Sequence, residues 1–314
     1  MRELDIEARG LTKVFANGVV AVKDLDLAVD RGSVYGLIGR NASGKTTALR
    51  LLMGLLHANQ GEARVLGWSM WEAPRSARQC VAYVSQTHRL PGGMSLEELS
   101  RCLKRVNARL DPGHARALAR DWALPWTRTI GSLSNGEQRR AGLLLAFASR
   151  PTVLVLDEPA AGFDLVARRE FMEQILDVIT RRDGCTVLLS THIIGDLERM
   201  ADHIGIMDRG RLALSIPLED FLNQIKRVQV IFDAEEAPAG FVIPGALNTS
   251  RAGAVFNAIV RWTSGSELEV LRASANARVQ VFPIGLEEIF VELFGKVNRA
   301  DGGFLPNDTD QDIQ

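Results

Sequence analysis

GRNASGKTT, residues 39–47, follows an apolar run that ends at Ile38 and precedes the helical pattern ALRLLMGLL. A P-loop requires this strand, loop and helix context. Backbone N–H groups from Asn41 to Thr46 can surround the β-phosphate of a nucleotide, because the loop leads into the positive end of a helix. Lys45 would reach the β and γ oxygens, and the Thr46 hydroxyl would bind Mg²⁺. The sequence therefore predicts a nucleotide site at Gly39, Arg40, Asn41, Ala42, Ser43, Gly44, Lys45, Thr46 and Thr47.

A second motif, TVLVLDEP at residues 152–159, places two carboxylates at the end of an apolar strand. Adjacent strand residues face opposite ways, so we expect the two acids to have different roles. Asp157 would hold Mg²⁺ through a water molecule, and Glu158 would orient the attacking water or act as its general base. The alternative is an ordinary strand end capped by acids, which the P-loop makes less plausible.

The turn in GSLSNGEQRRAGLLLA, residues 131–146, has two interpretations. The first is a helix cap, with Ser134 or Asn135 at the N-cap and Glu137 in the first turn. The second is an anion site, because a glycine-bearing helix N-terminus with a free hydroxyl presents unpaired N–H groups. The turn alone does not decide between them.

The composition excludes several classes of protein. The 314 residues carry 37 Lys+Arg and 38 Asp+Glu, a net charge of -1, so the overall charge gives no indication of nucleic-acid binding. The three cysteines are scattered, which indicates neither a disulfide framework nor a zinc site and fits a reducing compartment. The N-terminus lacks a signal core and no apolar run reaches about 18 residues, so we expect no membrane span.

The order of patterns along the chain predicts an α/β fold. Alternation in residues 1–32 predicts an antiparallel opening, and compact apolar runs predict buried parallel strands at residues 33–39, 80–86, 152–159, 185–192 and 203–212. A helical subdomain is expected at about 88–150, with its Arg and Lys series on a solvated face.

A smaller domain is expected towards the C-terminus. After the principal domain at 1–215, we predict a linker at 216–226 and an accessory α/β domain at 227–297. Its last helix would bury one apolar face, formed by Leu286, Ile289, Phe290, Leu293 and Phe294. The polar segment 298–314 is expected to be disordered.

Over about residues 4–215 these motifs, in this order, resemble the nucleotide-binding subunit of ATP-binding-cassette (ABC) transporters. The resemblance implies a P-loop NTPase with a RecA-like core, an antiparallel β subdomain and a helical subdomain, which binds ATP and Mg²⁺. Its implied residue roles are Phe15 on adenine, Gln86 as a catalytic residue and metal ligand between core and helical subdomain, LSNGEQ as the signature loop, Asp164 in the D-loop and His192 as the switch histidine near the γ-phosphate.

The resemblance also implies two partners. One is a second nucleotide-binding subunit, from the same or a related cassette, which packs head to tail. Ser134 and the backbone at Asn135 and Gly136 would then hold the γ-phosphate of an ATP bound mainly by that subunit, with Glu137 in the same nucleotide-binding loop. The other is a transmembrane permease, which would keep this chain at the cytoplasmic face of the membrane. Docking is expected through THRLPGGMSLEEL, near Leu90 and Met94.

The sequence departs from the family pattern in the D-loop. Ala160, Ala161, Phe163 and Leu165 stand where Thr, Ser, Leu and Pro are usual. The two lost hydroxyls remove hydrogen bonds across the subunit interface. The C-terminal extension resembles that of exporter subunits, so export is favoured over import. Two alternatives stay open: a soluble ABC ATPase outside transport, and a nucleotide-binding switch with little hydrolysis.

Overall fold

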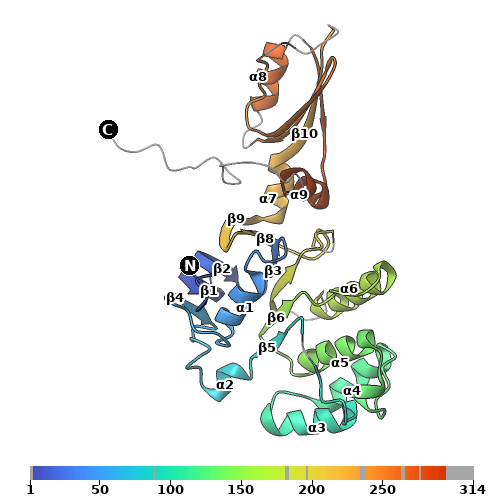
Figure 1. Ribbon diagram of the computed structural model, residues 1–314. Coiled ribbons are helices and arrows are strands. Elements are labelled where there is room, and N and C mark those ends of the chain that lie inside the picture. Colours follow the sequence, from blue (N-terminus) through green and yellow to red (C-terminus); the bar gives the residue numbers. More distant parts are fainter. Residues whose placement is uncertain are drawn as a thin grey trace. The chain divides into compact units, whose positions relative to one another are not determined.

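The computed structural model describes residues 3–87, 89–180, 184–195, 197–233, 238, 240–262, 266–275 and 277–294. Contacts between residues divide the chain into two compact units (Figure 1). The first consists of Met1–His192 and Arg199–Ser215, and the second of Ile193–Glu198 and Ile216–Gln314. The predicted tail at 298–314 lies outside the described residues.

The first unit is built on a six-stranded sheet in the order β5-β6-β7-β3-β8-β9. The first five strands in that order are parallel. Every residue of β3, β6 and β7 is buried, as their apolar composition predicts. The strand bounds are β3 Val34–Gly39, β5 Val81–Val84, β6 Val153–Asp157, β7 Thr186–Thr191, β8 His203–Asp208 and β9 Arg211–Pro217.

The apolar run at 203–212 forms two strands rather than the single strand predicted. β8 ends at Asp208, and Arg209 and Gly210 have φ of 46° and 83° before β9 begins. A turn with two positive φ values fits a hairpin between adjacent strands. The Gly210 N–H donates to the carbonyl of Ser43 at 2.9 Å, so this turn braces the P-loop.

A three-stranded antiparallel sheet, in the order β2-β1-β4, packs with α1 in one core. The sequence predicts its first two strands but not β4, whose residues QGEARV are mostly exposed and polar. The bounds are β1 Leu4–Val14, β2 Val20–Asp30, β4 Gln60–Val65 and α1 Lys45–Leu52.

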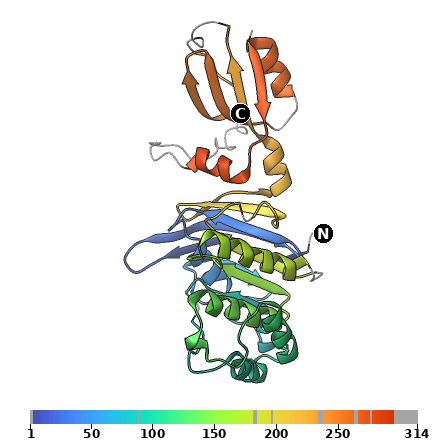
Figure 2. The same cartoon turned by 90° about the vertical axis from the view of Figure 1, so that its right-hand side faces the viewer.

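The remaining helices of the first unit follow the helical pattern of the sequence. Figures 1 and 2 show α3, α4 and α5 gathered at one end of this unit. Ser95 and Ser134 begin α3 and α5 through capping boxes with Glu98 and Glu137. In the described part of the chain no helix is long and apolar enough to span a bilayer. The bounds are α2 Arg75–Arg78, α3 Leu96–Val106, α4 Pro112–Asp121, η1 Ile130–Ser132, α5 Asn135–Ala148 and α6 Leu165–Thr180.

The second unit is a four-stranded sheet in the order β11-β12-β10-β13 with helices α7, α8 and α9. Leu271 of α8 belongs to the apolar core on one face of the sheet. Arg227 of β10 lies 2.6 Å from Glu288 of α9, and the Leu286 N–H at the start of α9 donates to Glu198. The bounds are α7 Leu218–Gln224, β10 Ile225–Ile231, β11 Ala246–Ala252, β12 Val255–Arg261, α8 Ser266–Ala275, β13 Arg278–Phe282 and α9 Leu286–Phe294.

Two expectations from the sequence concern this unit. One differs from the structure, and the other falls partly outside the described residues. The stretch predicted as a linker at 216–226 contains helix α7 and the first residues of β10. Its apolar positions explain the helix, since Leu218 and Phe221 are buried. Of the predicted apolar face of α9, Leu286 and Ile289 are buried, and the side chains of Leu293 and Phe294 lie outside the described residues.

Candidate nucleotide and hydrolysis site

The P-loop joins the buried strand β3 to α1, and two of its glycines pack so closely against neighbouring backbone that a side chain would clash there. A Cβ atom on Gly39 would lie 2.5 Å from the Met207 carbonyl, and one on Gly44 would lie 2.4 Å from the Ala21 carbonyl. Gly44 has φ of 106°, which also favours glycine. The Ser43 hydroxyl is buried without a hydrogen-bond partner in the described structure. Because such groups are normally satisfied, this hydroxyl fits a loop that receives a polar ligand.

Lys45 and Thr46 begin α1 and point to the two acids at the end of β6, Asp157 in the strand and Glu158 directly after it. Lys45 is only 5% exposed; its Nζ donates to the Gly39 carbonyl at 2.7 Å and lies 3.3 Å from Glu158 Oε1. The Thr46 hydroxyl donates to Asp157 Oδ1 at 3.0 Å. A buried ammonium and a hydroxyl beside carboxylates form a site that fits phosphate oxygens together with a hard cation.

Asp157 has two further hydrogen-bond donors. Ser190 on the neighbouring strand β7 donates to Oδ1 at 2.7 Å, and the Tyr83 hydroxyl donates to Oδ2 at 3.3 Å. Burial, together with the negative charge of Asp157, raises the pKa of Tyr83 to about 12, so Tyr83 remains a neutral donor. Asp157 is therefore held as an oriented acceptor beside Thr46.

Glu158 contacts different groups. Its Oε2 lies 2.6 Å from His192 Nδ1, and its N–H donates to the carbonyl of Ser190 at 3.0 Å. Glu158 has φ of 49°, an uncommon conformation for this residue type, which directs its buried side chain between Lys45 and His192. Glu158 thus has a cation near one oxygen and an imidazole near the other, so both oxygens of its carboxylate are held in place.

The protein groups suited to Mg²⁺ are few. In the described part of the chain, no three His, Cys, Asp or Glu side chains gather into a metal cluster. Thr46 and Asp157 offer one hydroxyl and one carboxylate, and Mg²⁺ usually keeps several waters and takes phosphate oxygens. The donor set therefore fits a cation that arrives with a nucleotide.

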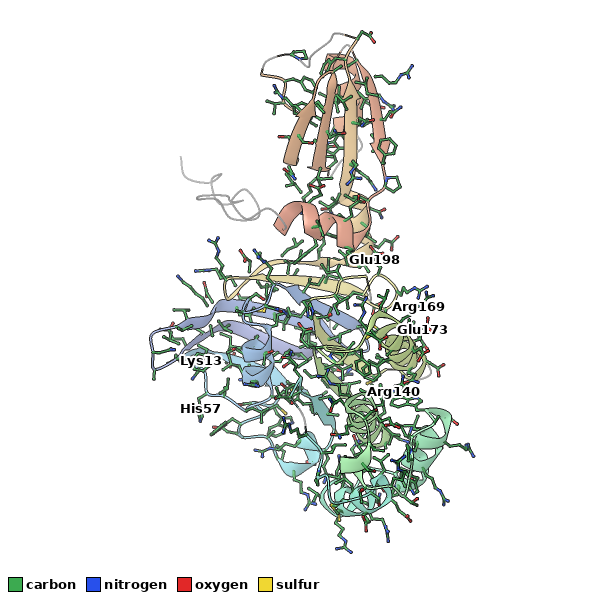
Figure 3. All side chains as sticks on the ribbon, turned by 45° about the vertical axis from the view of Figure 1, so that its right-hand side comes forward. Lys13, His57, Arg140, Arg169, Glu173 and Glu198 are labelled. Carbon is green, nitrogen blue, oxygen red and sulfur yellow. The ribbon has the colours of Figure 1, made fainter. Side chains whose placement is uncertain are left out.

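Phe15 lies just beyond β1, at a tight turn closed by its own N–H bond to the Val19 carbonyl at 2.9 Å. Its side chain is one of the exposed aromatic rings of the first unit, at 38%. Lys13 Nζ lies 5.7 Å from the ring centroid and donates to the His57 carbonyl; both residues are labelled in Figure 3. An exposed ring of this kind offers a stacking surface for a base.

The signature loop lines a cleft of about 980 Å³, which none of residues 39–47 lines. Ser134 is exposed, and its hydroxyl donates to Glu137 Oε2 at 2.8 Å while it accepts from the Glu137 N–H. The hydrogen bonds from the N–H and hydroxyl of Ser134 lower the pKa of Glu137. The lining residues are Gln86, Thr87, Arg89, Ser134, Asn135, Gly136, Glu137, Gln138, Arg139, Arg140, Gly162, Phe163, Asp164 and Ala167.

The structure also places Asp164 and Gln86, two of the residues that the resemblance identified. Asp164 Oδ1 accepts from the N–H groups of Val166 and Ala167, so it caps α6. Gln86 is exposed; it lines the cleft and also a cavity of about 20 Å³ whose wall includes Glu158. Gln86 therefore lines one space together with the signature loop and another together with Glu158.

Sequence reasoning missed Ser190 and Tyr83. Ser190 pairs with Asp157 across the parallel register of β6 and β7, and Tyr83 belongs to the other neighbour, β5. Both lie in apolar strand runs near recognised motifs: Ser190 is two residues before His192, and Tyr83 is three residues before Gln86. Strand register was the missing information.

The comparisons with known proteins agree on one family. The family described as "ABC transporter" matches residues 22–161. The Nod factor export ATP-binding protein I of Cupriavidus pinatubonensis is 31% identical over 313 residues, covering 94% of this chain and 92% of that protein. The ABC transporter ATP-binding protein YtrB of Bacillus subtilis is 29% identical, covering 94% of this chain and 99% of that protein.

Solved structures of known proteins match about two thirds of the chain in fold. A structure titled as the ATP binding subunit of an ABC transporter has a TM-score of 0.62 and 26% identity, covering 69% of this chain and 92% of that one. A dimeric bacterial ABC transporter cassette has a TM-score of 0.61 at 21% identity, covering 68% of this chain and 98% of that one. The predicted P-loop NTPase fold and the predicted resemblance are both confirmed.

Proposed function

This chain belongs to the ATP-binding proteins of ABC transporters, whose activity is ATP hydrolysis coupled to transport, and we propose that it works as a head-to-tail dimer that drives export through a separate membrane-spanning subunit. Mg²⁺-ATP is its nucleotide. Relatives named for Nod factor export and for daunorubicin/doxorubicin resistance support the direction of transport.

One observation carries the dimer: the two sets of phosphate-binding groups lie in different places on the chain. One cluster consists of Lys45, Thr46, Asp157 and Glu158. The cleft beside Ser134 is separate from it, because none of residues 39–47 lines that cleft. A second copy in head-to-tail contact would bring its cleft to this P-loop. The exposed Ser134 hydroxyl and the helix N-terminus behind it would then meet the γ-phosphate.

Each group of the first cluster has a proposed role. Lys45 binds the β and γ oxygens, and Thr46 with Asp157 holds Mg²⁺, which neutralises charge on the phosphates. Glu158 takes a proton from the attacking water, and His192 keeps that carboxylate oriented through Nδ1. A nucleotide switch without hydrolysis would have no use for this pair, so the ATPase is favoured over that alternative.

The deciding experiment uses Glu158→Gln. The amide keeps the shape but cannot accept the proton, so hydrolysis should fall by at least about 100-fold while binding of fluorescent ATP is preserved. The persisting γ-phosphate should hold a dimer in MgATP and not in MgADP, measured by size-exclusion chromatography with light scattering. Adding Ser134→Arg should return this protein to a monomer. A Glu158→Gln protein that stays monomeric in saturating MgATP contradicts a self-sufficient homodimer.

The permease is proposed to dock beside the segment that follows Gln86, holding the chain at the cytoplasmic face of the membrane. Leu90 and Met94 are half-buried there. A groove of about 450 Å³ lined by Leu55, Trp71 and Tyr83, among others, lies on the strand that leads to Gln86. Charged substitutions at Leu90 or Met94 should uncouple transport and preserve ATP affinity; unchanged transport would contradict this placement.

Residues 1–215 are proposed to fold as the cassette, with 227–297 as an accessory domain. The supporting observation is that each unit has its own apolar core. A chain that ends at Ser215 should then still bind Mg²⁺-ATP. Regulation, dimerisation and bracing of the cassette remain three open roles for the accessory domain.

A further inference from the structure

The D-loop, in which Ala160, Ala161 and Phe163 replace the usual residues, packs against α5 of its own chain, the helix that begins in the signature loop. The ring of Phe163 stacks on Phe171 of α6, with centroids 4.9 Å apart and an interplanar angle of 17°. Gly136 of the signature loop lies against the edge of the same ring, where an added Cβ would come within 3.2 Å of Phe163 Cε1. Phe163 therefore fills a space that depends on the glycine.

Arg139 of α5 holds the same loop by its backbone. Its Nη1 donates to the carbonyl of Ala161, and its guanidinium carbon lies 5.9 Å from the centroid of the Phe163 ring. Arg139 is half-buried, and its charge strengthens the hydrogen bond and adds a cation–π contact. The Arg139 side chain thus holds both the backbone and the aromatic ring of the D-loop against α5.

This contact continues to the proposed base. The Ala161 N–H donates to the carbonyl of Glu158 at 3.1 Å, so residues 158–161 form a turn whose far end is held by Arg139. Arg139 and Glu158 also line the same small cavity, of about 20 Å³. A void of that size leaves little room for the turn to shift independently of α5.

We propose that Arg139 is a positioning residue for hydrolysis, which transmits nucleotide contact at the signature loop to Glu158 of the same chain. This inference rests on the proposed head-to-tail dimer. There, ATP in one site touches Ser134 and Gly136 at the start of α5, and Arg139 of that helix sets the base of the other site. The link acts within one chain and replaces the cross-interface hydroxyls that Ala160 and Ala161 lack.

The test is Arg139→Ala with steady-state ATP hydrolysis. We expect kcat to fall roughly 10- to 100-fold, because small misplacements of catalytic groups have effects of this size. KM for ATP should stay within about twofold, and the Hill coefficient should fall from above 1 to 1. The matched control is Arg169→Ala on α6, whose exposed Nε pairs with Glu173 Oε1 at 3.1 Å (Figure 3). The control should keep the kcat and Hill coefficient of the unmodified chain.

Two further measurements separate the explanations. Arg139→Lys keeps a charged donor for the Ala161 carbonyl, so it should recover part of the kcat and part of the Hill coefficient that Arg139→Ala loses. The proposal is overturned if Arg139→Lys loses as much kcat as Arg139→Ala while its Hill coefficient equals that of the unmodified chain. In a Glu158→Gln background Arg139→Ala should still form the MgATP dimer. If Glu158→Gln dimerises while Arg139→Ala alone has unmodified kcat and Hill coefficient, the inference fails and the proposed function stands.

Discussion

The N-termini of α3 and α5 carry the same cap in different surroundings. In α3 the Ser95 N–H donates to Glu98 Oε2 at 2.9 Å and the Ser95 hydroxyl accepts from the Glu98 N–H at 3.2 Å. In α5 the corresponding distances between Ser134 and Glu137 are 2.8 and 3.2 Å. Ser95 is 6% exposed, whereas Ser134 is exposed and lines the large cleft.

Hydrogen-bond geometry therefore does not distinguish a structural cap from a ligand-binding one. Both helices present a serine hydroxyl and a positive dipole end, so both could attract an anion on those grounds. Access decides: only the α5 cap opens on the cleft, beside Gln86 and the D-loop. The same four-residue pattern is thus proposed to serve two roles, a structural cap at α3 and a ligand-binding cap at α5, and matched substitutions at the two caps can separate them.

The largest difference between the caps is expected in turnover. Ser134→Ala should lower kcat about 10- to 100-fold, because it removes a donor proposed to act on the γ-phosphate. Ser95→Ala should leave kcat within about twofold, since its hydroxyl reaches no nucleotide. Steady-state ATPase assays measure both. Equal losses of activity in the two variants would mean that the α5 box is only a cap.

Stability should show the opposite order. Ser95→Ala is expected to reduce the free energy of unfolding by about 1 kcal/mol, because the Glu98 N–H loses its acceptor at a buried position. Ser134→Ala should cost less, because water can replace the hydroxyl at an exposed helix end. Urea unfolding of both variants, compared at equal m-values, provides the measurement. A larger loss for Ser134→Ala would contradict this assignment.

A smaller effect is expected from charge. Glutamine can complete a capping box, so Glu137→Gln keeps the helix start and removes a negative charge next to the proposed phosphate contact. KM for MgATP should fall about threefold at low salt, with the gain disappearing at high salt. Glu98→Gln is the control and should not change KM. A salt-independent change, or the same change in both variants, would argue against an electrostatic cause.

The smallest effect concerns acid. Hydrogen bonds from Ser95 and Ser134 lower the pKa of Glu98 and Glu137, respectively. A carboxylate with a lowered folded-state pKa contributes stability above its unfolded value, about 4.3, and loses it as the pH falls through the folded value. Both caps should weaken together in acid, only slightly because Glu98 is exposed and Glu137 is only half-buried. Glu98→Gln and Glu137→Gln should each lose less stability than the unmodified chain between pH 6 and about pH 3; identical acid profiles would refute this.

Sequence predicted the local parts of the site and missed the parts created by register. Lys45 and Thr46 follow from one continuous motif, and Asp157 with Glu158 from one strand end, since short segments fix their geometry. Phe15, Gln86 and His192 depended on resemblance, because single residues carry little signal. Ser190 and Arg139 needed the pairing of β6 with β7 and the packing of α5 on the D-loop, which no local pattern encodes.

The fold shows the same division. Buried strands β3, β6 and β7 were predictable because burial on both faces leaves continuous apolar runs. The exposed edge strand β4 has no such run and was missed. The hairpin between β8 and β9 was merged into one strand, because apolar composition continued on both sides of Arg209 and Gly210.

The backbone of Glu158 has a consequence for natural variation. At φ of 49° a residue with a Cβ carries roughly 1 kcal/mol of strain that glycine would not. If backbone strain were the only factor, selection for stability would favour glycine at this position. The acid in this chain carries that strain, which fits the proposed role of its carboxylate in turnover. Related chains that have given up hydrolysis should be the ones in which this position is free to change.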